Sequence, residues 1–201
     1  MIALVDYGAG NVFSVFKALE TVGAQVRLTT EPAVVRSADK VVLPGVGAFA
    51  DCMSALRRTG LAAAIQESVN RGVPFLGICV GMQVLFDVGE ELGHHAGLSL
   101  LPGRVVRFAH KHLKVPHTGW NQLLPCRDSP LLQGLPVGAW AYFNHAYHCL
   151  AHTAHVLTET DYGGSFISAV WHDSIHGIQF HPEKSQAVGL RILRNFVEAV
   201  P

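Results

Sequence analysis

A cysteine between two glycines, where an apolar strand meets the start of a helix, constrains the fold of this chain more than any other feature. The run from Val73 to Ile78 is apolar and has the length of a buried strand, and the segment after Gly81 can begin a helix. Because Gly77 and Gly81 lack side chains, the strand and the helix can approach closely while the turn holds Cys79 in a strained conformation. The pattern is the thiol counterpart of the nucleophile elbow G-x-S-x-G.

The turn around Cys79 has the features of a nucleophilic site. The N-terminus of the following helix lies beside the sulfur, where the helix dipole favours thiolate over thiol. The backbone amide of Val80 is free to point at an oxyanion. The alternative is a core cysteine in a tight strand-to-helix turn, because free cysteines are often buried. A partner for the sulfur elsewhere in the chain must decide between the two interpretations.

Apolar strands and amphipathic helices alternate through the first half of the chain. The pattern predicts strands at 2–7, 25–29, 40–43 and 73–78, and helices at 12–22, 49–56 and 61–71, with Asn11 as the cap of the first helix. This order indicates an α/β fold, with a mostly parallel open sheet flanked by helices. Residues 87–100 read as a loop.

The second half changes character to short strands separated by turns. We expect strands at 103–108, 114–120, 139–147, 156–160, 167–171 and 175–180, and a closing helix at 186–200. These strands add antiparallel members to the same sheet or beside it. No repeat or long linker divides the chain, so residues 1–201 are expected to form a single domain.

The composition excludes several classes of function. Lys plus Arg equals Asp plus Glu at 15 each, which gives no electrostatic case for nucleic acid or an anionic membrane surface. No stretch approaches the ~18 apolar residues that span a bilayer, and the first residues do not resemble a signal peptide. The four cysteines form no C-x-x-C pair and are expected to be reduced, as in the cytoplasm. Apolar content of 49% with 15% charge suggests a surface covered by a partner, although a thermostable or well-buried domain would look the same.

Two glycine-containing turns follow the early strands. Pro44-Gly45-Val46-Gly47 lies at the carboxyl end of a strand, where open parallel sheets bind ligands, and its peptide N–H groups could turn toward an anion. An ordinary strand-to-helix turn is the alternative. Gly8-Ala9-Gly10 lacks the G-x-G-x-x-G spacing of dinucleotide-binding turns, so we reject that function.

His181-Pro182-Glu183 follows the last expected strand and supplies the partner that the sulfur needs. Pro182 restricts the backbone, so that His181 and Glu183 can be held in one relative orientation. The three side chains meet the needs of a triad, with Cys79 as nucleophile, His181 as base and Glu183 holding the imidazole.

The segments that carry this chemistry resemble a known family. Gly77–Gln83 and Phe180–Glu183 look like the two signatures of class I, triad-type glutamine amidotransferases. Further segments are similar to the glutaminase subunits of imidazole glycerol phosphate synthase, and the resemblance covers essentially the whole chain. These segments are Asp6-Tyr7-Gly8-Ala9-Gly10-Asn11, Leu43-Pro44-Gly45-Val46-Gly47-Ala48-Phe49, Val115-Pro116-His117-Thr118-Gly119-Trp120-Asn121 and His181-Pro182-Glu183-Lys184-Ser185.

The resemblance implies an activity without a cofactor. Cys79 would attack the side-chain amide of glutamine, form a glutamyl thioester and release ammonia, and water would then free glutamate. The resemblance places the Val80 and Val46 amides in the oxyanion hole, the latter after a peptide flip. It assigns substrate binding to four residues: Gly47, Gln83, Ala146 and Tyr147.

The resemblance also implies a partner. A (β/α)8-barrel cyclase subunit would form a heterodimer with this chain and use the ammonia to make imidazole glycerol phosphate and the aminoimidazole carboxamide ribotide of histidine biosynthesis. Asn11, Lys17, Trp120 and Lys184 match positions that face the cyclase. Their alternatives are an N-cap, solvated lysines and a core tryptophan.

The chain departs from the family pattern around residue 145. Asn144 and Ala146 replace an apolar residue and a hydroxyl, so affinity for glutamine falls if that hydroxyl matters; Val80, where leucine is common, leaves the amide unchanged. The chain also has histidine pairs at 145/148 and 152/155, but residues three apart on a strand point to opposite faces, so we expect no metal site.

Two other functions remain open at this point. The same glutaminase could serve anthranilate or pyridoxal phosphate synthesis, although the Pro116–Asn121 segment and the N-terminal segment argue against it. A catalytically inactive binding module on the same fold would require a broken elbow or triad, and both are intact.

Overall fold

The structure, a computed structural model, describes residues 1–8, 11–109 and 113–200. Ala9 and Gly10 of the rejected dinucleotide turn lie outside the described residues. The strands along the described chain are β1 (Ile2–Val5), β2 (Val26–Thr29), β3 (Lys40–Gly45), β4 (Phe75–Cys79), β5 (Phe86–Gly89), β6 (His95–Ala96), β7 (Leu101–Arg107), β8 (His117–Gln122), β9 (Leu124–Pro125), β10 (Trp140–His145), β11 (Tyr147–Ala151), β12 (Val156–Asp161), β13 (Ser165–His172) and β14 (Ile175–Ile178).

Five parallel strands in the order β2-β1-β3-β4-β14 form one half of the main sheet. Their apolar side chains are buried on both faces, as expected for parallel strands covered by helices. The antiparallel strands continue this sheet in the order β13-β11-β7, with β5 and β6 beyond them. The prediction of an α/β fold with a mostly parallel sheet and added antiparallel strands is therefore confirmed.

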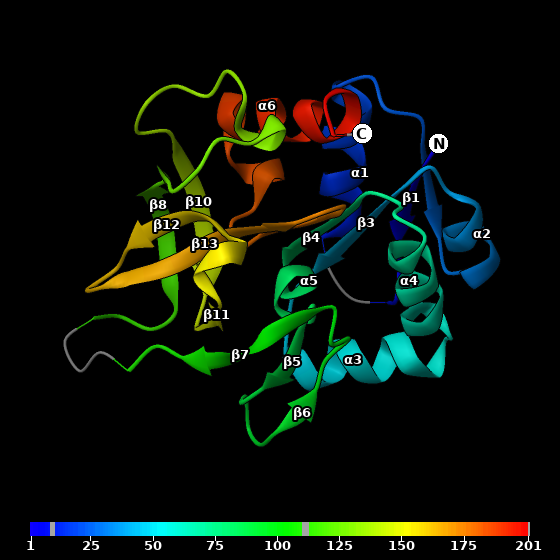
Figure 1. Ribbon diagram of the computed structural model, residues 1–201, viewed down its shortest axis with the longest axis horizontal. Coiled ribbons are helices and arrows are strands. Elements are labelled where there is room, and N and C mark those ends of the chain that lie inside the picture. The colour runs from blue at the N-terminus through cyan, green and yellow to red at the C-terminus, as the bar shows by residue number, and fades with distance from the viewer. Residues whose placement is uncertain (9–10, 110–112, 201) are drawn as a thin grey trace.

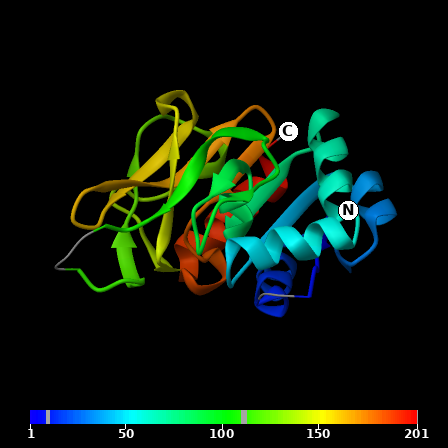
Figure 2. The same cartoon turned by 90° about the horizontal axis from the view of Figure 1, so that it is seen from below.

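Helices cover both faces of the parallel half. α1 and α6 lie together on one side, and α3 and α4 lie on the other (Figure 1). Seen from below, the helices gather at one end of the molecule and the antiparallel strands at the other (Figure 2). The helices are α1 (Val12–Thr21), α2 (Pro32–Ser37), α3 (Phe49–Arg58), α4 (Leu61–Asn70), α5 (Val80–Gln83) and α6 (Gln186–Glu198), with short 3-10 turns η1 (Pro130–Leu132), η2 (Thr153–His155) and η3 (Pro182–Lys184).

Several local predictions are corrected. Asn11 occupies the N-cap position of α1, but its side chain accepts a hydrogen bond from the Ser14 hydroxyl and does not cap the helix backbone. The helix after the elbow is the single turn α5, and the chain then enters β5, so residues 87–100 are not all loop. The segment 139–147 is two strands, β10 and β11, which belong to different sheets because β10 pairs with β8 alone in a separate two-stranded sheet.

The largest correction concerns β14. The sequence pattern grouped it with the antiparallel strands, but β14 runs parallel to β4, with Ile178 opposite Ile78. Since parallel strands end at the same edge, this pairing brings the residues after β14 to the edge where β4 ends.

The buried apolar side chains of the described residues form one cluster that includes strands of both halves. This continuity supports our proposal that residues 1–201 are a single domain. Within the described ranges, no helix has both the length and the apolar character needed to cross a bilayer.

Candidate active site

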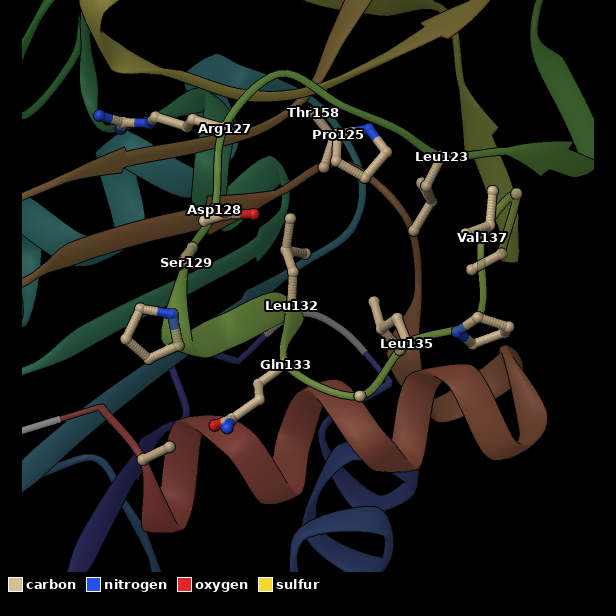
Figure 3. Close-up of a pocket in the computed structure, with 16 residues that line it drawn as sticks. Leu123, Pro125, Arg127, Asp128, Ser129, Leu132, Gln133, Leu135, Val137 and Thr158 are labelled. Carbon is tan, nitrogen blue, oxygen red and sulfur yellow. The ribbon is translucent and has the colours of Figure 1, made fainter.

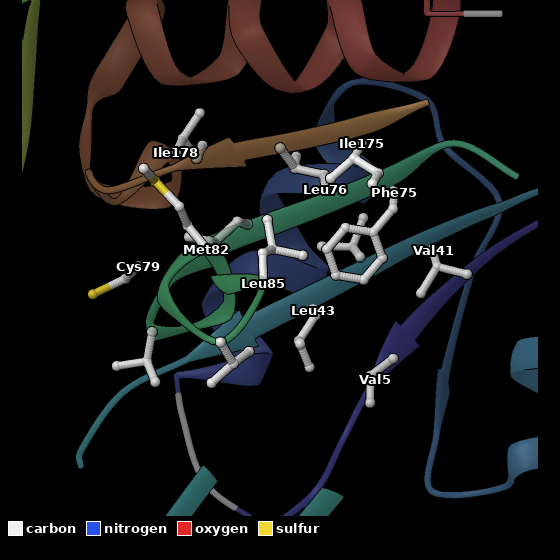
Figure 4. Packing of buried hydrophobic residues seen from close by; sticks show 14 of the residues in the cluster. Val5, Val41, Leu43, Phe75, Leu76, Cys79, Met82, Leu85, Ile175 and Ile178 are labelled. Carbon is white, nitrogen blue, oxygen red and sulfur yellow. The ribbon is translucent and has the colours of Figure 1, made fainter. Parts of the chain in front are cut away.

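Three strand ends meet at the carboxyl edge of the parallel sheet. The register of β3 and β4 places Gly45 opposite Cys79, and β14 ends beside β4. The 45–47 loop, Cys79 and the 179–181 segment therefore lie at one edge although they come from distant parts of the sequence. Figure 4 shows the sulfur of Cys79 at the end of β4, pointing away from the apolar core.

Close packing holds the backbone of Cys79 in a left-handed conformation, with φ of 56°. A Cβ atom on Gly77 would lie 2.3 Å from the carbonyl oxygen of Gly81, and one on Gly81 would lie 2.0 Å from the carbonyl oxygen of Leu43. Both distances are far below a van der Waals contact. Glycine is therefore required at both positions, and the strain at Cys79 is maintained by the surrounding backbone.

Cys79, His181 and Glu183 come together at this edge. His181 Nδ1 lies 3.0 Å from Glu183 Oε1, in a pair whose side chains are almost fully buried. Burial disfavours the imidazolium, but hydrogen bonds to Cys79 and Glu183, together with their negative charges, raise the pKa of His181 to about 10. Since Nδ1 bonds Glu183, the ring nitrogen left for Cys79 is Nε2. The arrangement suits a thiolate–imidazolium pair.

Ser185, which sequence analysis did not single out as a site residue, fixes the backbone of His181. Its buried hydroxyl donates to the His181 carbonyl at 2.7 Å and accepts the Tyr142 N–H at 2.9 Å. The His181 N–H in turn donates to the Tyr142 carbonyl. Two hydrogen bonds thereby join β10 to the His181 turn and a third closes the turn itself, and together they orient the imidazole.

A cavity of about 240 Å³ opens at the sulfur. It is smaller than the ~300–1,000 Å³ pockets that hold drug-sized ligands, and it suits an amino acid. Its walls include all the predicted oxyanion and substrate residues: Val46, Gly47, Val80, Gln83, Ala146 and Tyr147. They also include four residues to which we gave no role in binding: Glu91, Pro116, Asn144 and His145.

The predicted oxyanion residue Val46 interacts with Tyr7 below the loop. Burial raises the pKa of the Tyr7 phenol, and the Val46 N–H, which interacts with the phenol oxygen, acts against that rise. The buried hydroxyl of Tyr7 makes no hydrogen bond of good geometry within the described residues. An amide that faces the phenol is directed away from an oxyanion at Cys79, which agrees with the expected peptide flip at Val46. Gly47 next to it has φ of +90° with open space around it, which leaves the loop room to rotate.

A buried hydrogen-bond chain lines the other side of the sulfur. Gln83 Nε2 donates to the Tyr147 carbonyl and to Gln179 Oε1, both at 3.0 Å, and Gln179 Nε2 donates to Cys79 Sγ at 3.6 Å. The Tyr147 carbonyl also lies 2.8 Å from His145 Nδ1. Sequence analysis did not single out Gln179, although it lies two residues before His181.

Two neutral histidines continue this chain. His117 Nδ1 lies 3.2 Å from His145 Nε2, and His117 Nε2 lies 3.3 Å from Asn121 Nδ2. Burial lowers the pKa of His145 to about 3 and that of His117 to about 4, so both rings are neutral at pH 7. Asn121 is anchored further by its bond to the Asp161 carbonyl.

Three aromatic and basic side chains form an exposed cluster near the triad. Lys184 Nζ lies 5.6 Å from the centre of the Tyr142 ring, and the edge of Trp120 meets the same ring. Trp120 is 44% exposed, so it is not the core residue considered as its alternative. Lys17 pairs with Glu20 on its own helix and borders a surface hollow that also includes Glu183. Asn11 is exposed at the start of α1.

The histidine pairs considered for metal binding lie differently from the prediction. His145 and His148 belong to two strands, while His152 caps the 3-10 turn η2 and His155 is its last residue, so the strand-face argument was wrong for both pairs. Within residues 1–8, 11–109 and 113–200, no group of three or more His, Cys, Asp or Glu side chains is arranged to hold a metal.

Asn144 accepts a hydrogen bond from the Thr118 hydroxyl at 3.1 Å.

A larger cavity, about 760 Å³, lies elsewhere. Figure 3 shows it between the 123–139 segment and α6, lined mainly by Leu, Pro and Val side chains. None of the described residues that line it also lines the cavity at Cys79. None of the described residues that line it is a cysteine or a histidine, whereas Cys79 and His181 both line the smaller cavity.

Comparison with known proteins agrees with this geometry. The family model "Glutamine amidotransferase class-I" matches residues 3–200. The chain is 53% identical to imidazole glycerol phosphate synthase subunit HisH of Syntrophotalea carbinolica over 203 residues, covering 98% of each chain. It is 51% identical to the subunit of the same name from Salinibacter ruber, covering 98% of this chain and 93% of the relative. Its fold resembles the structure of PurLQS from Thermotoga maritima, with a TM-score of 0.77, 17% identity, and coverage of 100% of this chain and 98% of that one.

Proposed function

Because the chain belongs to the class-I glutamine amidotransferase family, we propose that it is the glutaminase subunit of an imidazole glycerol phosphate synthase and supplies ammonia for histidine biosynthesis. The observation that carries this proposal is the convergence of the Cys79 sulfur and the buried His181–Glu183 pair on one small cavity.

Cys79 is the nucleophile in the proposed reaction. Its sulfur bonds to the amide carbon of glutamine, His181 gives a proton to the leaving nitrogen, and ammonia departs as the C–N bond breaks. A water molecule then attacks the thioester and gives a proton to His181. The C–S bond breaks, glutamate leaves and the sulfur is restored. Glu183 keeps Nδ1 protonated and stabilises the imidazolium, so that Nε2 performs both proton transfers.

The remaining cavity residues bind substrate and transition state in this proposal. The amides of Val80 and, after rotation, Val46 hold the oxyanion, since losing one such donor typically costs ~3 kcal/mol. Gly47, Gln83, Ala146 and Tyr147 surround the amino-acid end of glutamine. Glu91 adds a carboxylate for the substrate ammonium; its other contact is the Phe49 N–H, 2.8 Å away.

The partner in this proposal is a (β/α)8-barrel cyclase subunit that forms a heterodimer with the chain and receives the ammonia. The relatives are named as subunits of a synthase, which supports assembly with a second chain. The exposed Trp120–Tyr142–Lys184 cluster, next to the triad, suits the face that meets the cyclase, with Asn11 and Lys17 at its margin. We further propose a cytoplasmic location, supported by four free cysteines and the biosynthetic role of the relatives.

Replacing Cys79 with Ser tests the catalytic proposal in the reconstituted synthase. Glutamine-dependent turnover should fall about 10³-fold or more, because a hydroxyl is a far weaker nucleophile at neutral pH than a thiolate. Turnover with ammonium chloride should remain, since the cyclase then needs no glutaminase. Glutamine-dependent turnover that survives the substitution would contradict the proposal. Because turnover with ammonium chloride does not depend on the glutaminase, co-elution of the Cys79→Ser subunit with the cyclase is the separate check that the two subunits still assemble.

A further inference from the structure

We infer that Gln179 is a positioning residue for the nucleophile, holding the Cys79 sulfur through an N–H donor that a buried chain of hydrogen bonds keeps in place. The inference rests on the proposed function, because it concerns the reaction assigned to Cys79. Gln179 is fully buried, its amide nitrogen lies 3.6 Å from Sγ, and its own backbone N–H donates to the Ser168 carbonyl on β13.

The orientation of the Gln179 amide is determined by its neighbours. The Tyr147 carbonyl can only accept, so the Gln83 group facing it must be the NH₂. That same NH₂ faces Gln179 at 3.0 Å, which requires the oxygen of Gln179 there. The nitrogen of Gln179 is then the atom directed at the sulfur. Rotating the amide would place two donors face to face and remove the donor from Cys79.

The same carbonyl orders the histidines behind it. Because the Tyr147 oxygen accepts, His145 carries its proton on Nδ1, and Nε2 accepts from His117. His117 then carries its proton on Nδ1 and accepts from Asn121 through Nε2. When both imidazoles are neutral, every hydrogen-bond donor in the chain faces an acceptor. The chain therefore runs from β8, beside exposed Trp120, to the reacting sulfur.

An N–H donor directed at sulfur favours the charged form over the neutral thiol. Gln179 thus adds a second donor to the one from His181 and holds the sulfur between them. The other titratable groups that act on the sulfur or line its cavity are Tyr7, Cys149, Glu91, His145 and Tyr147. A substitution of Gln179 leaves all of these in place and removes the N–H directed at the sulfur together with the acceptor of the Gln83 amide, which keeps its bond to the Tyr147 carbonyl.

The test is the pH dependence of Cys79 alkylation by iodoacetamide. A Cys126→Ser background removes the exposed thiol, while Cys52 and Cys149 are buried. Gln179→Met keeps the volume and removes the donor, and the midpoint of the alkylation rate should move up by about one pH unit. In the synthase, kcat for glutamine should fall about tenfold with KM changed little. Gln66→Met, which removes an amide that bonds the Leu98 carbonyl away from the site, should move neither quantity.

A second variant covers the case in which Gln179→Met fails to fold. Gln179→Asn keeps an amide but shortens it by one methylene, which withdraws the donor from Sγ, and the same upward shift is expected. A midpoint within about 0.3 pH units of wild type in a folded variant overturns the inference. Alkylation requires no glutamine. An inactive wild type would therefore reject the proposed function, whereas an unmoved midpoint rejects the role of Gln179.

Discussion

Two halves of the molecule, the parallel half of the main sheet and the antiparallel half that includes the separate β8–β10 sheet, hold the site by different means. On the parallel side, the nucleophile is placed by steric contact: Gly77 and Gly81 leave no space for even one methyl group at the turn. On the antiparallel side, the cavity wall is held by hydrogen bonds between neutral polar groups, which run from Asn121 through two histidines and the Tyr147 backbone carbonyl to Gln83 on α5. A strained turn needs hard contacts to persist. A buried wall that touches a polar substrate needs matched donors and acceptors.

The buried histidines show the same difference. His181 belongs to the turn after β14 and has a raised pKa because a thiol and a carboxylate face it. His145, on β10, has a lowered pKa because burial dominates there. One ring is suited to carry charge and the other to remain neutral, although both are almost fully buried. Burial alone therefore does not determine the protonation of a histidine at this site; the charges facing it do.

The largest effect should come from Gly81→Ala, which tests the steric half of the comparison. The new Cβ would lie 2.0 Å from the Leu43 carbonyl, so either the turn or β3 must move. We expect a loss of at least about 4 kcal/mol in the free energy of unfolding, measured by urea denaturation, together with loss of glutaminase activity.

Gly72→Ala is the matched control for this substitution. Gly72 also lies in the parallel half and has φ of +81°, but nothing lies within 4 Å of its Cβ position. Only backbone strain should appear, about 1–2 kcal/mol. Equal losses for the two variants would mean that the close contact at Gly81 costs no more than the backbone strain at Gly72, which would contradict a steric hold on the elbow.

The next largest effect tests the electrostatic difference between the halves by pH. The pKa of His145 is lower in the folded than in the unfolded chain, so the unfolded chain binds more protons between pH 6.5 and about 3, and stability is lost as pH falls through this range. In His145→Gln this loss is absent. The stability advantage of wild type over the variant should therefore shrink by about 3 kcal/mol between pH 7 and pH 4.

His181→Gln should give the opposite slope. The pKa of His181 is raised in the folded chain, so its contribution is fully present below pH 6.5 and is lost as pH rises through about 10. Wild type should lose its advantage over this variant on the alkaline side. Thermal or urea unfolding of the three proteins from pH 4 to pH 10 checks both slopes, since the carboxylates they share cancel in the differences. Parallel slopes for the two histidines would remove the distinction between the halves.

Sequence analysis found the parts of the site whose residues are contiguous in the sequence. The elbow is one run of seven residues, and His181-Pro182-Glu183 is another, so local pattern was sufficient. The parallel pairing of β14 with β4 was missed because it depends on which distant strand is the neighbour. The sequence of a short apolar strand does not show whether it pairs in parallel or antiparallel. α2 was missed because one and a half turns give too little periodicity.

The hydrogen bonds of this wall could not be read from the sequence, although Gln83 and Tyr147 were expected at the site. Its members come from four separate segments, and each is an ordinary polar residue in its own context. The strand-face argument also failed at His145 and His148, because β10 ends at His145 and a new strand, β11, begins at Tyr147. Networks of this kind become visible only once the topology has brought the segments together.

The smallest expected effect concerns two buried or half-buried tyrosines, one in each half. Tyr7, after β1, has a hydroxyl without a hydrogen bond of good geometry, whereas the Tyr162 hydroxyl, after β12, donates to the Lys114 carbonyl at 2.7 Å. Tyr162→Phe should cost about 1 kcal/mol in the free energy of unfolding. Tyr7→Phe should cost nothing or stabilise by less than about 1 kcal/mol, because an unmatched buried hydroxyl is removed.

Tyr7→Phe should also change activity, and this makes its small effect on stability informative. The phenol oxygen interacts with the Val46 N–H, and removing that oxygen removes an interaction that stabilises the orientation of the amide toward residue 7. Rotation toward the oxyanion position then becomes easier, so the glutaminase rate in the absence of a cyclase should rise a few-fold, while Tyr162→Phe leaves it unchanged. A lower rate for Tyr7→Phe would mean that the hydroxyl supports the active orientation of the loop, because a hydroxyl can also donate to the Gly45 carbonyl that replaces the amide after rotation.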